Sequence, residues 1–188
     1  MPANTPARVL TVEDNPIVRA DLRLILEDAG FEVCADARDG VEAVELARSQ
    51  RPDLILIDLN LPGVDGIEAT RRILDERDVP IVALTGDRGA VVERAMEAGA
   101  VAHVLKPFQE AHLVNTITGA LAERVERDEA VNNAEAERYR RLALVESMVR
   151  ANYTEHEIGR ALRGYYEPAY DPSRDVRFSS WIRALFGG

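Results

Sequence analysis

Acidic, hydroxyl and ammonium side chains stand at the ends of short apolar runs along residues 1–122. In chain order they are Glu13, Asp14, Asp58, Thr85 and Lys106. If the runs are parallel strands of one sheet, their carboxyl ends meet at one edge and bring these side chains together. Crowded carboxylates repel one another unless a cation neutralises them, and an all-oxygen ligand set suits Mg²⁺. An aspartate in such a site can attack phosphorus while a metal and a lysine disperse charge, so the pattern indicates phosphoryl transfer to a carboxylate.

The elements that must position these side chains alternate between strand and helix. We predict strands over 8–12, 31–36, 54–57, 79–84 and 102–105, each followed by a helix, over 16–29, 41–49, 66–75, 90–98 and 110–122. The run Leu54–Ile57 is apolar on both faces, which is typical of a parallel sheet covered by helices on both sides. The sequence therefore predicts an α/β domain over residues 1–122.

Four motifs in this domain resemble those of the receiver domains of two-component response regulators, the CheY-like family. They are Val-Glu-Asp-Asn at 12–15, Pro-Asp-Leu-Ile-Leu-Ile-Asp-Leu-Asn-Leu-Pro-Gly-Val-Asp-Gly at 52–66, Ala-Leu-Thr-Gly at 83–86 and Ala-Gly-Ala-Val-Ala-His-Val-Leu-Lys-Pro-Phe at 98–108. The resemblance covers about residues 7–122. It implies a flavodoxin-like (βα)5 fold with parallel strand order 2-1-3-4-5.

The resemblance also implies roles for individual residues at the strand ends. Asp58 corresponds to the phosphoacceptor, and Lys106 is expected to contact the phosphoryl oxygens. Asp14, Asp58 and the backbone carbonyl of Asn60 are expected to hold Mg²⁺, and Glu13 completes the acidic pocket, acting through a bound water.

A switch is implied by the same resemblance. Thr85 is expected to move toward the phosphoryl group, which opens a gap for the side chain at position 103. The family more often has Tyr or Phe there, whereas this chain has His103, which puts both the packing of the inward state and its pH dependence in question. Pro107 is expected to follow a cis peptide bond that aims Lys106 at the site.

These residues also have other interpretations. Glu13 and Asp14 could simply favour a helix N-terminus, Thr85 could be a turn residue before Gly86, and His103 could be an ordinary buried or edge histidine. Haloacid-dehalogenase-type phosphatases also combine an aspartate nucleophile with Thr, Lys and Mg²⁺, but they usually have a second acid two residues later, where this chain has Asn60. We therefore expect a phosphoryl acceptor with slow autodephosphorylation at most, and not an enzyme.

Composition limits the compartment and the partners. The chain has a formal net charge of -10, so its composition does not indicate a basic domain that binds nucleic acid. Its one cysteine, Cys34, excludes an internal disulfide and is expected to be a small core residue. No membrane-spanning run or signal peptide is apparent, so we expect a cytoplasmic protein with no membrane partner. His112 and His156 are expected at the surface.

The sequence of residues 123–188 predicts helices and no second sheet. No proline occurs between Pro107 and Pro168, so the helix from Glu110 can continue as a helical linker over 123–138, although the polar stretch 128–137 could instead form a loop. Thr154 and Glu157 form a capping-box pattern that opens another helix. We predict a small helical output module over 139–188, whose tail, containing Trp181, either folds back on it or docks on a partner.

Three hypotheses for the output remain open: relay to another protein, nucleic-acid binding, or dimerisation alone. A helix-turn-helix or an antiterminator-type RNA-binding module is disfavoured because Pro168 and Pro172 stand where a further helix would begin and the Ala-Lys-Gly signature is absent from the sequence. We expect a sensor histidine kinase as phosphoryl donor, a homodimer through the fifth helix and the linker, and a protein target more than DNA or RNA.

Overall fold

The structure, a computed structural model, describes residues 5–151 and 154–163. The chain forms two compact units, Met1–Arg127 and Asp128–Gly188, and passes from one to the other within helix α5 (Glu110–Arg150). The predicted tail with Trp181 lies outside the described residues. Among the described residues, no helix has an apolar stretch long enough to cross a bilayer.

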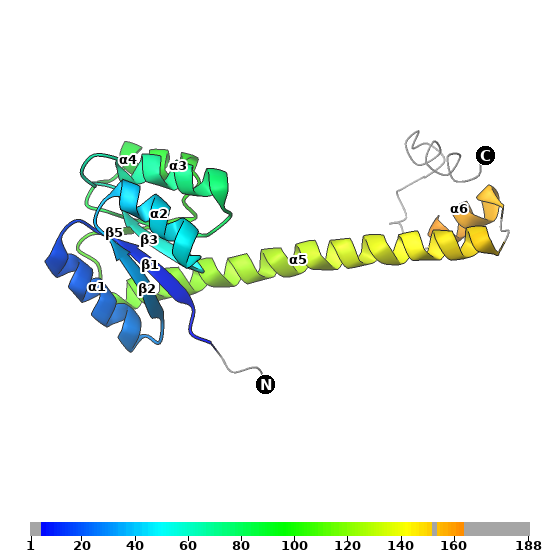
Figure 1. Cartoon of the computed structure of the whole chain (residues 1–188), viewed down its shortest axis with the longest axis horizontal. Coiled ribbons are helices and arrows are strands. Elements are labelled where there is room, and N and C mark those ends of the chain that lie inside the picture. Colours follow the sequence, from blue (N-terminus) through cyan, green and yellow to red (C-terminus); the bar gives the residue numbers. More distant parts are fainter. Residues whose placement is uncertain (1–4, 152–153, 164–188) are drawn as a thin grey trace. The chain divides into compact units, whose positions relative to one another are not determined.

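The first unit is a five-stranded parallel sheet flanked by helices (Figure 1). The strands are β1 (Arg8–Val12), β2 (Glu32–Ala37), β3 (Leu54–Asp58), β4 (Ile81–Thr85) and β5 (Ala102–Leu105). The connecting helices are α1 (Pro16–Asp28), α2 (Gly40–Gln50), α3 (Gly66–Glu76) and α4 (Ala90–Glu97). The strand order is β2-β1-β3-β4-β5, which confirms the predicted flavodoxin-like fold.

The alternation of side chains along β3 produces two apolar layers. Leu54 and Leu56 pack with α1 and the first part of α5, whereas Ile55 and Ile57 pack with α2 and α3. Figure 1 shows α1 and α5 on one face of the sheet and α2, α3 and α4 on the other. Each fully buried aliphatic side chain contributes about 1.5–3 kcal/mol, so a strand that is apolar on both faces anchors the centre of the sheet.

Short polar side chains fix where the helices begin. The Asn15 side chain accepts a hydrogen bond from the Ile17 amide, 2.9 Å away, at the start of α1. Asp39 and Asp65 cap α2 and α3 in the same way. Such caps satisfy amides that have no partner within the helix, and here they set the first turn of each helix just beyond the end of a strand.

The second unit contains the later part of α5 and helix α6 (Glu155–Arg163). Val145, Ile158 and Leu162 are buried against one another, as expected for two amphipathic helices joined by a turn. The predicted capping box is confirmed: the Thr154 amide donates to Glu157 Oε2 at 2.8 Å, and the Glu157 amide donates back to Thr154 Oγ1 at 3.4 Å. The polar stretch 128–137 is helical within α5, so the loop alternative is wrong.

Candidate functional site

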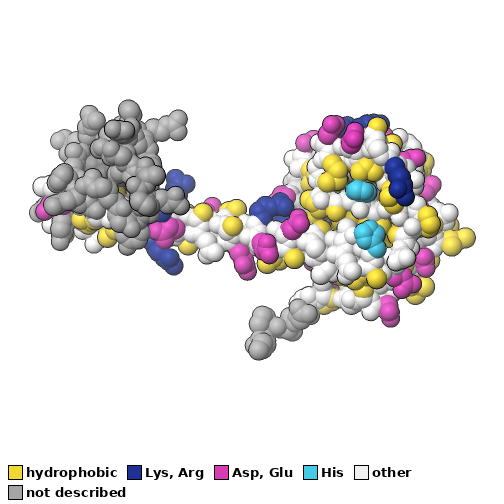
Figure 2. All heavy atoms as spheres, turned by 180° about the vertical axis from the view of Figure 1, so that it is seen from behind, with side chains coloured by type: hydrophobic (Ala, Val, Ile, Leu, Met, Phe, Trp, Pro, Cys, Tyr) yellow, Lys and Arg dark blue, Asp and Glu magenta, His cyan; other side chains and the backbone are white. Residues whose placement is uncertain are grey.

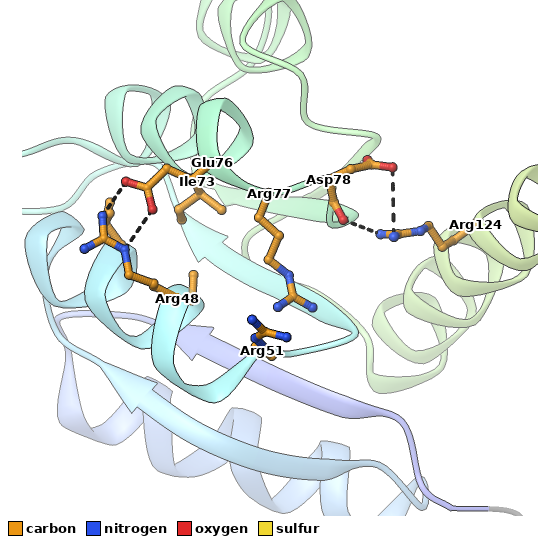
Figure 3. A pocket seen from close by; sticks show the side chains of 9 residues that line it. Arg48, Arg51, Ile73, Glu76, Arg77, Asp78 and Arg124 are labelled. Atoms are coloured by element: carbon orange, nitrogen blue, oxygen red, sulfur yellow. Dashed lines mark hydrogen bonds and ion pairs between the residues drawn. The ribbon is translucent and has the colours of Figure 1, made fainter.

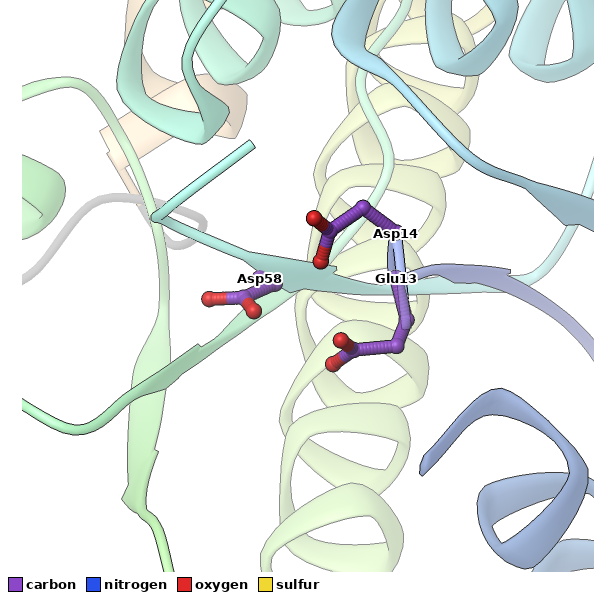
Figure 4. Close-up of side chains that lie close together, drawn as sticks. All are labelled: Glu13, Asp14 and Asp58. Atoms are coloured by element: carbon purple, nitrogen blue, oxygen red, sulfur yellow. The ribbon is translucent and has the colours of Figure 1, made fainter. Parts of the chain in front are cut away.

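Three carboxylates meet at the carboxyl ends of two neighbouring strands. Glu13 and Asp14 directly follow β1, and Asp58 is the last residue of β3, which pairs with β1 so that Val12 stands opposite Ile57. One oxygen from each carboxylate lies within 4.8 Å of the others. Glu13 and Asp58 are 1% and 6% exposed, whereas Asp14 is exposed to solvent. Figure 4 shows the three side chains close together. The register of the parallel sheet therefore assembles the acidic group that the sequence predicts.

Lys106 supplies the positive charge of this group. It follows β5, and its Nζ atom lies 2.6 Å from Glu13 Oε2 and 2.6 Å from Asp58 Oδ2. Burial raises the pKa of Glu13, and the hydrogen bond from Lys106 opposes that shift only in part. Burial alone would lower the pKa of Lys106, but its hydrogen bonds to Asp58 and Glu13 outweigh burial, so the pKa is raised. Lys106 therefore stays protonated between two carboxylates.

Close packing of α3 holds the end of β3 in place. A Cβ atom at Gly66 would lie 2.1 Å from the backbone oxygen of Asp58 and 2.8 Å from Leu59 Cα, so only glycine fits there. The Asp58 carboxylate also accepts a hydrogen bond from the Asn60 amide, 3.0 Å from Oδ1. These contacts fix both the backbone and the carboxylate of Asp58.

Thr85 and Asn60 are linked through Asp87. Thr85 is fully buried at the end of β4, and its Oγ1 accepts a hydrogen bond from the Asp87 amide at 3.0 Å. The Asn60 side-chain amide donates to Asp87 Oδ2 at 3.3 Å. Sequence reasoning missed Asp87, because its contact with Asn60 depends on how two loops approach each other and has no characteristic spacing. The loop after β4 is thus tied to the loop after β3.

Two of the predicted switch residues, His103 and Pro107, lie on β5 and just beyond it. His103 is exposed, and the Lys106–Pro107 peptide bond is cis, as expected. His112 is also exposed, in agreement with its predicted surface position. Figure 2 shows histidine side chains next to apolar ones on the surface of the first unit. His103 therefore sits in its outward position in this structure.

The donor set fits a divalent cation. Three carboxylates with a single ammonium group leave two negative charges, which a doubly charged ion neutralises. All available side-chain ligands are oxygen atoms, which favours Mg²⁺ over softer metals. Glu13, Asp14 and Asp58 are the side chains that can hold it, and the Asn60 carbonyl remains a predicted fourth ligand.

Comparisons with known proteins agree with this geometry. Residues 9–118 match the family described as response regulator receiver domain. The transcriptional regulatory protein PdtaR of Mycobacterium tuberculosis is 43% identical over 121 residues, which cover 64% of this chain and 59% of PdtaR. This chain thus aligns with less than two thirds of that relative's length.

Solved structures give the same result. A two-component response regulator of the LuxR family from Aurantimonas sp. SI85-9A1 has a TM-score of 0.59 and 42% identity, over 63% of this chain and 86% of that one. The receiver domain of the sensor histidine kinase PA1611 from Pseudomonas aeruginosa has a TM-score of 0.58 and 34% identity, over 62% of this chain and 98% of that one. That structure has a magnesium ion coordinated in its active-site cleft.

Proposed function

Because the chain belongs to the response regulator receiver domain family, we propose that it is a two-component response regulator that accepts a phosphoryl group on Asp58 from a sensor histidine kinase. The observation that carries this proposal is the contact of Lys106 Nζ with Asp58 Oδ2 at 2.6 Å, beside a carboxylate trio whose oxygens lie within 4.8 Å. A nucleophilic carboxylate, a cation and a metal-binding acidic pair are the groups that phosphoryl transfer needs.

In the proposed reaction an oxygen of Asp58 attacks the phosphorus of a phosphohistidine on the kinase. The new bond joins phosphorus to the carboxylate oxygen, the phosphorus–nitrogen bond breaks, and the imidazole leaves with the bonding electron pair. Lys106 stabilises negative charge on the transferring oxygens, because its protonated Nζ already lies beside Asp58. Burial of Asp58 and Glu13 limits screening by water and strengthens this interaction.

A bound Mg²⁺ would be held by Asp14, Asp58 and the Asn60 carbonyl, with Glu13 acting through water. When present, it neutralises charge on the carboxylates and on the phosphoryl oxygens. The protein itself orients the nucleophile. The Asn60 amide donates to Asp58 Oδ1, and Gly66 allows α3 to pack against the backbone of Asp58.

The same site can change state after transfer. Thr85 Oγ1 accepts a hydrogen bond from the Asp87 amide in this structure. Its hydroxyl proton can still be donated to a phosphoryl oxygen. Movement of Thr85 would alter the Asp87–Asn60 contact, because the Asp87 amide donates to Thr85. It would also change the space available to His103, so the two changes would occur together. We propose Thr85, His103 and Pro107 as the switch residues.

Phosphorylation by acetyl phosphate with Mg²⁺ tests the proposal directly. Intact-protein mass spectrometry should show the mass of one added phosphoryl group, which hydroxylamine removes as expected for an acyl phosphate. Asp58→Asn should abolish the added mass, while Asp75→Asn, an exposed aspartate on α3, should leave it unchanged. Equal phosphorylation of Asp58→Asn and the wild type would rule out Asp58 as the acceptor.

The output that we propose is a protein interaction or a homodimer through α5. Arginines on the later part of α5 are paired with glutamates one turn away: Arg140 and Arg141 with Glu137, and Arg150 with Glu146. These pairs reduce the positive charge that a nucleic-acid surface requires. Analytical ultracentrifugation with beryllofluoride and Mg²⁺ should show a change of mass in the wild type and none in Asp58→Asn.

Nucleic-acid binding is the second candidate, because the similar protein PdtaR carries the name of a transcriptional regulatory protein. It predicts binding of DNA or RNA that weakens steeply as salt rises. Absence of binding by the phosphorylated protein at low salt would exclude it.

A further inference from the structure

A cavity of about 410 Å³ lies at the opposite edge of the sheet from Asp58. It is lined by side chains of α2, α3 and the first part of α5, and by the segments that precede β3 and β4 (Figure 3). These segments enter the amino ends of the strands, whereas Asp58 and Thr85 stand at the carboxyl ends. The cavity lies wholly within the first unit and shares no lining residue with the acidic site.

Charge in this cavity has the opposite sign to that of the domain. Four arginines and two acids line it, although residues 1–127 contain 14 basic and 23 acidic side chains. Arg48 is neutralised by Glu76, with nitrogen–oxygen distances of 2.9 Å and 2.5 Å. Asp78 interacts with Arg124 and also with Arg127, at 3.9 Å and 3.8 Å, so its single charge serves two arginines.

Neither Arg51 nor Arg77 is in contact with a carboxylate of the residues that the structure describes. Arg77 donates from one terminal nitrogen to the Pro52 carbonyl at 3.0 Å, but its Nε is buried without a hydrogen-bond partner. Among the described residues, the Arg51 guanidinium has no hydrogen bond or ion pair. Figure 3 shows the two guanidinium groups facing each other. Burial, together with the charges of Arg51 and Arg124, lowers the pKa of Arg77.

Two facing guanidinium groups repel each other, and a buried N–H without a hydrogen-bond partner is also unfavourable. An oxyanion between them would relieve this repulsion, because guanidinium donors match the oxygens of phosphate in pairs. Two neighbouring guanidinium groups, neither in contact with a carboxylate of the described residues, favour a dianion over an anion with one charge. A volume of about 410 Å³ is within the range of small-molecule sites and leaves room for a group attached to the phosphate.

We propose that this cavity binds a small phosphate-bearing molecule between Arg51 and Arg77. The site is separate from the phosphoryl-acceptor site and does not depend on the proposed function of Asp58. Inorganic phosphate and a phosphomonoester share the chemistry that these arginines recognise, and the experiment distinguishes them.

The full chain is titrated with inorganic phosphate, with ribose 5-phosphate and with ribose by calorimetry, at constant ionic strength and in EDTA so that no Mg²⁺ bridges the ligand to Asp58. Wild type should bind both phosphates and not ribose, and tighter binding of ribose 5-phosphate would identify a phosphomonoester as the ligand. Arg51→Gln should weaken binding roughly tenfold, the effect of losing one charge-assisted contact. Arg71→Gln, an exposed arginine of α3 outside the cavity, is the matched control.

Arg77→Gln provides a second variant, and circular dichroism checks that it folds, because Arg77 also holds the Pro52 carbonyl. Loss of phosphate binding in folded Arg77→Gln and in Arg51→Gln, but not in Arg71→Gln, would support the site. The proposal is overturned if wild type binds neither phosphate, or if the three variants bind phosphate as the wild type does.

Discussion

Lys106 Nζ lies 2.6 Å from Asp58 Oδ2, so the single lysine of the sequence is in direct contact with the proposed phosphoacceptor. The same ammonium lies 2.6 Å from Glu13, which makes it the bridge between a residue that follows β1 and one that ends β3. Since the remaining 22 basic residues are arginines, a compact ammonium is used only here. A point charge with three donors can contact two carboxylates at once in a confined space.

Lys106→Met should destabilise the first unit in the absence of Mg²⁺. Its loss leaves Glu13 and Asp58 buried without their cation, which we expect to lower the free energy of unfolding by about 3 kcal/mol. Adding Glu13→Gln to Lys106→Met should restore part of the loss, because it removes one of the two unpaired charges. Urea unfolding of the wild type, both single variants and the double variant measures this coupling, and strictly additive effects would contradict it.

Mg²⁺ should raise the unfolding temperature of the wild type, because a ligand that binds only the folded state stabilises it. Asp14→Asn should reduce this shift more than Glu13→Gln, since Asp14 is the expected direct ligand and Glu13 acts through water. Asp75→Asn, far from the acidic group in sequence and exposed, serves as the control. Equal shifts in Asp14→Asn and the wild type would show that the ion binds elsewhere.

The fold could be predicted from the sequence because its signals are local and repeat five times. An apolar run such as Leu54–Ile57, followed by polar turn residues and an amphipathic helix, is enough to predict each strand–helix unit. Strand order came from the family resemblance, since the pattern of β1 and β3 does not reveal that they are neighbours. Several boundaries differ by one or two residues: Asp58 and Thr85 are the last residues of their strands and not the residues after them.

Contacts between distant loops were beyond the reach of the sequence. The link from Asn60 to Asp87 depends on how two loops approach each other, and the facing of Arg51 and Arg77 depends on the close approach of two strand entries. Neither pair has a characteristic spacing. Ion pairs within α5, in contrast, follow the three- and four-residue spacing that a helix imposes on its surface.

Replacing Gly66 with alanine should destabilise the protein, whereas the same change at Gly119 should not. The new Cβ at position 66 would meet the backbone of Asp58 and Leu59, which cannot move without displacing β3, so we expect a loss of at least about 2 kcal/mol. Gly119 lies in α5 with no atom within 4 Å of its added Cβ, and alanine there should gain about 0.5–1 kcal/mol. Urea unfolding measures both, and acetyl phosphate acceptance should also fall in Gly66→Ala because Asp58 is displaced.

Ile158→Ala should loosen the packing of α6 on α5 without affecting phosphoryl acceptance. Ile158 is fully buried beside Val145 and Leu162, and removal of its side chain from this small cluster should cost about 2–4 kcal/mol. So large a loss in a cluster of few residues should open the second unit, seen as faster proteolysis and faster amide exchange over 145–163. Val131→Ala is the control, because Val131 is a 55% exposed apolar residue of the second unit, on α5. Unchanged amide exchange in Ile158→Ala would mean that α6 does not depend on this cluster. Equal acetyl phosphate acceptance in the wild type, Ile158→Ala and Val131→Ala would show that the first unit accepts the phosphoryl group without an intact cluster.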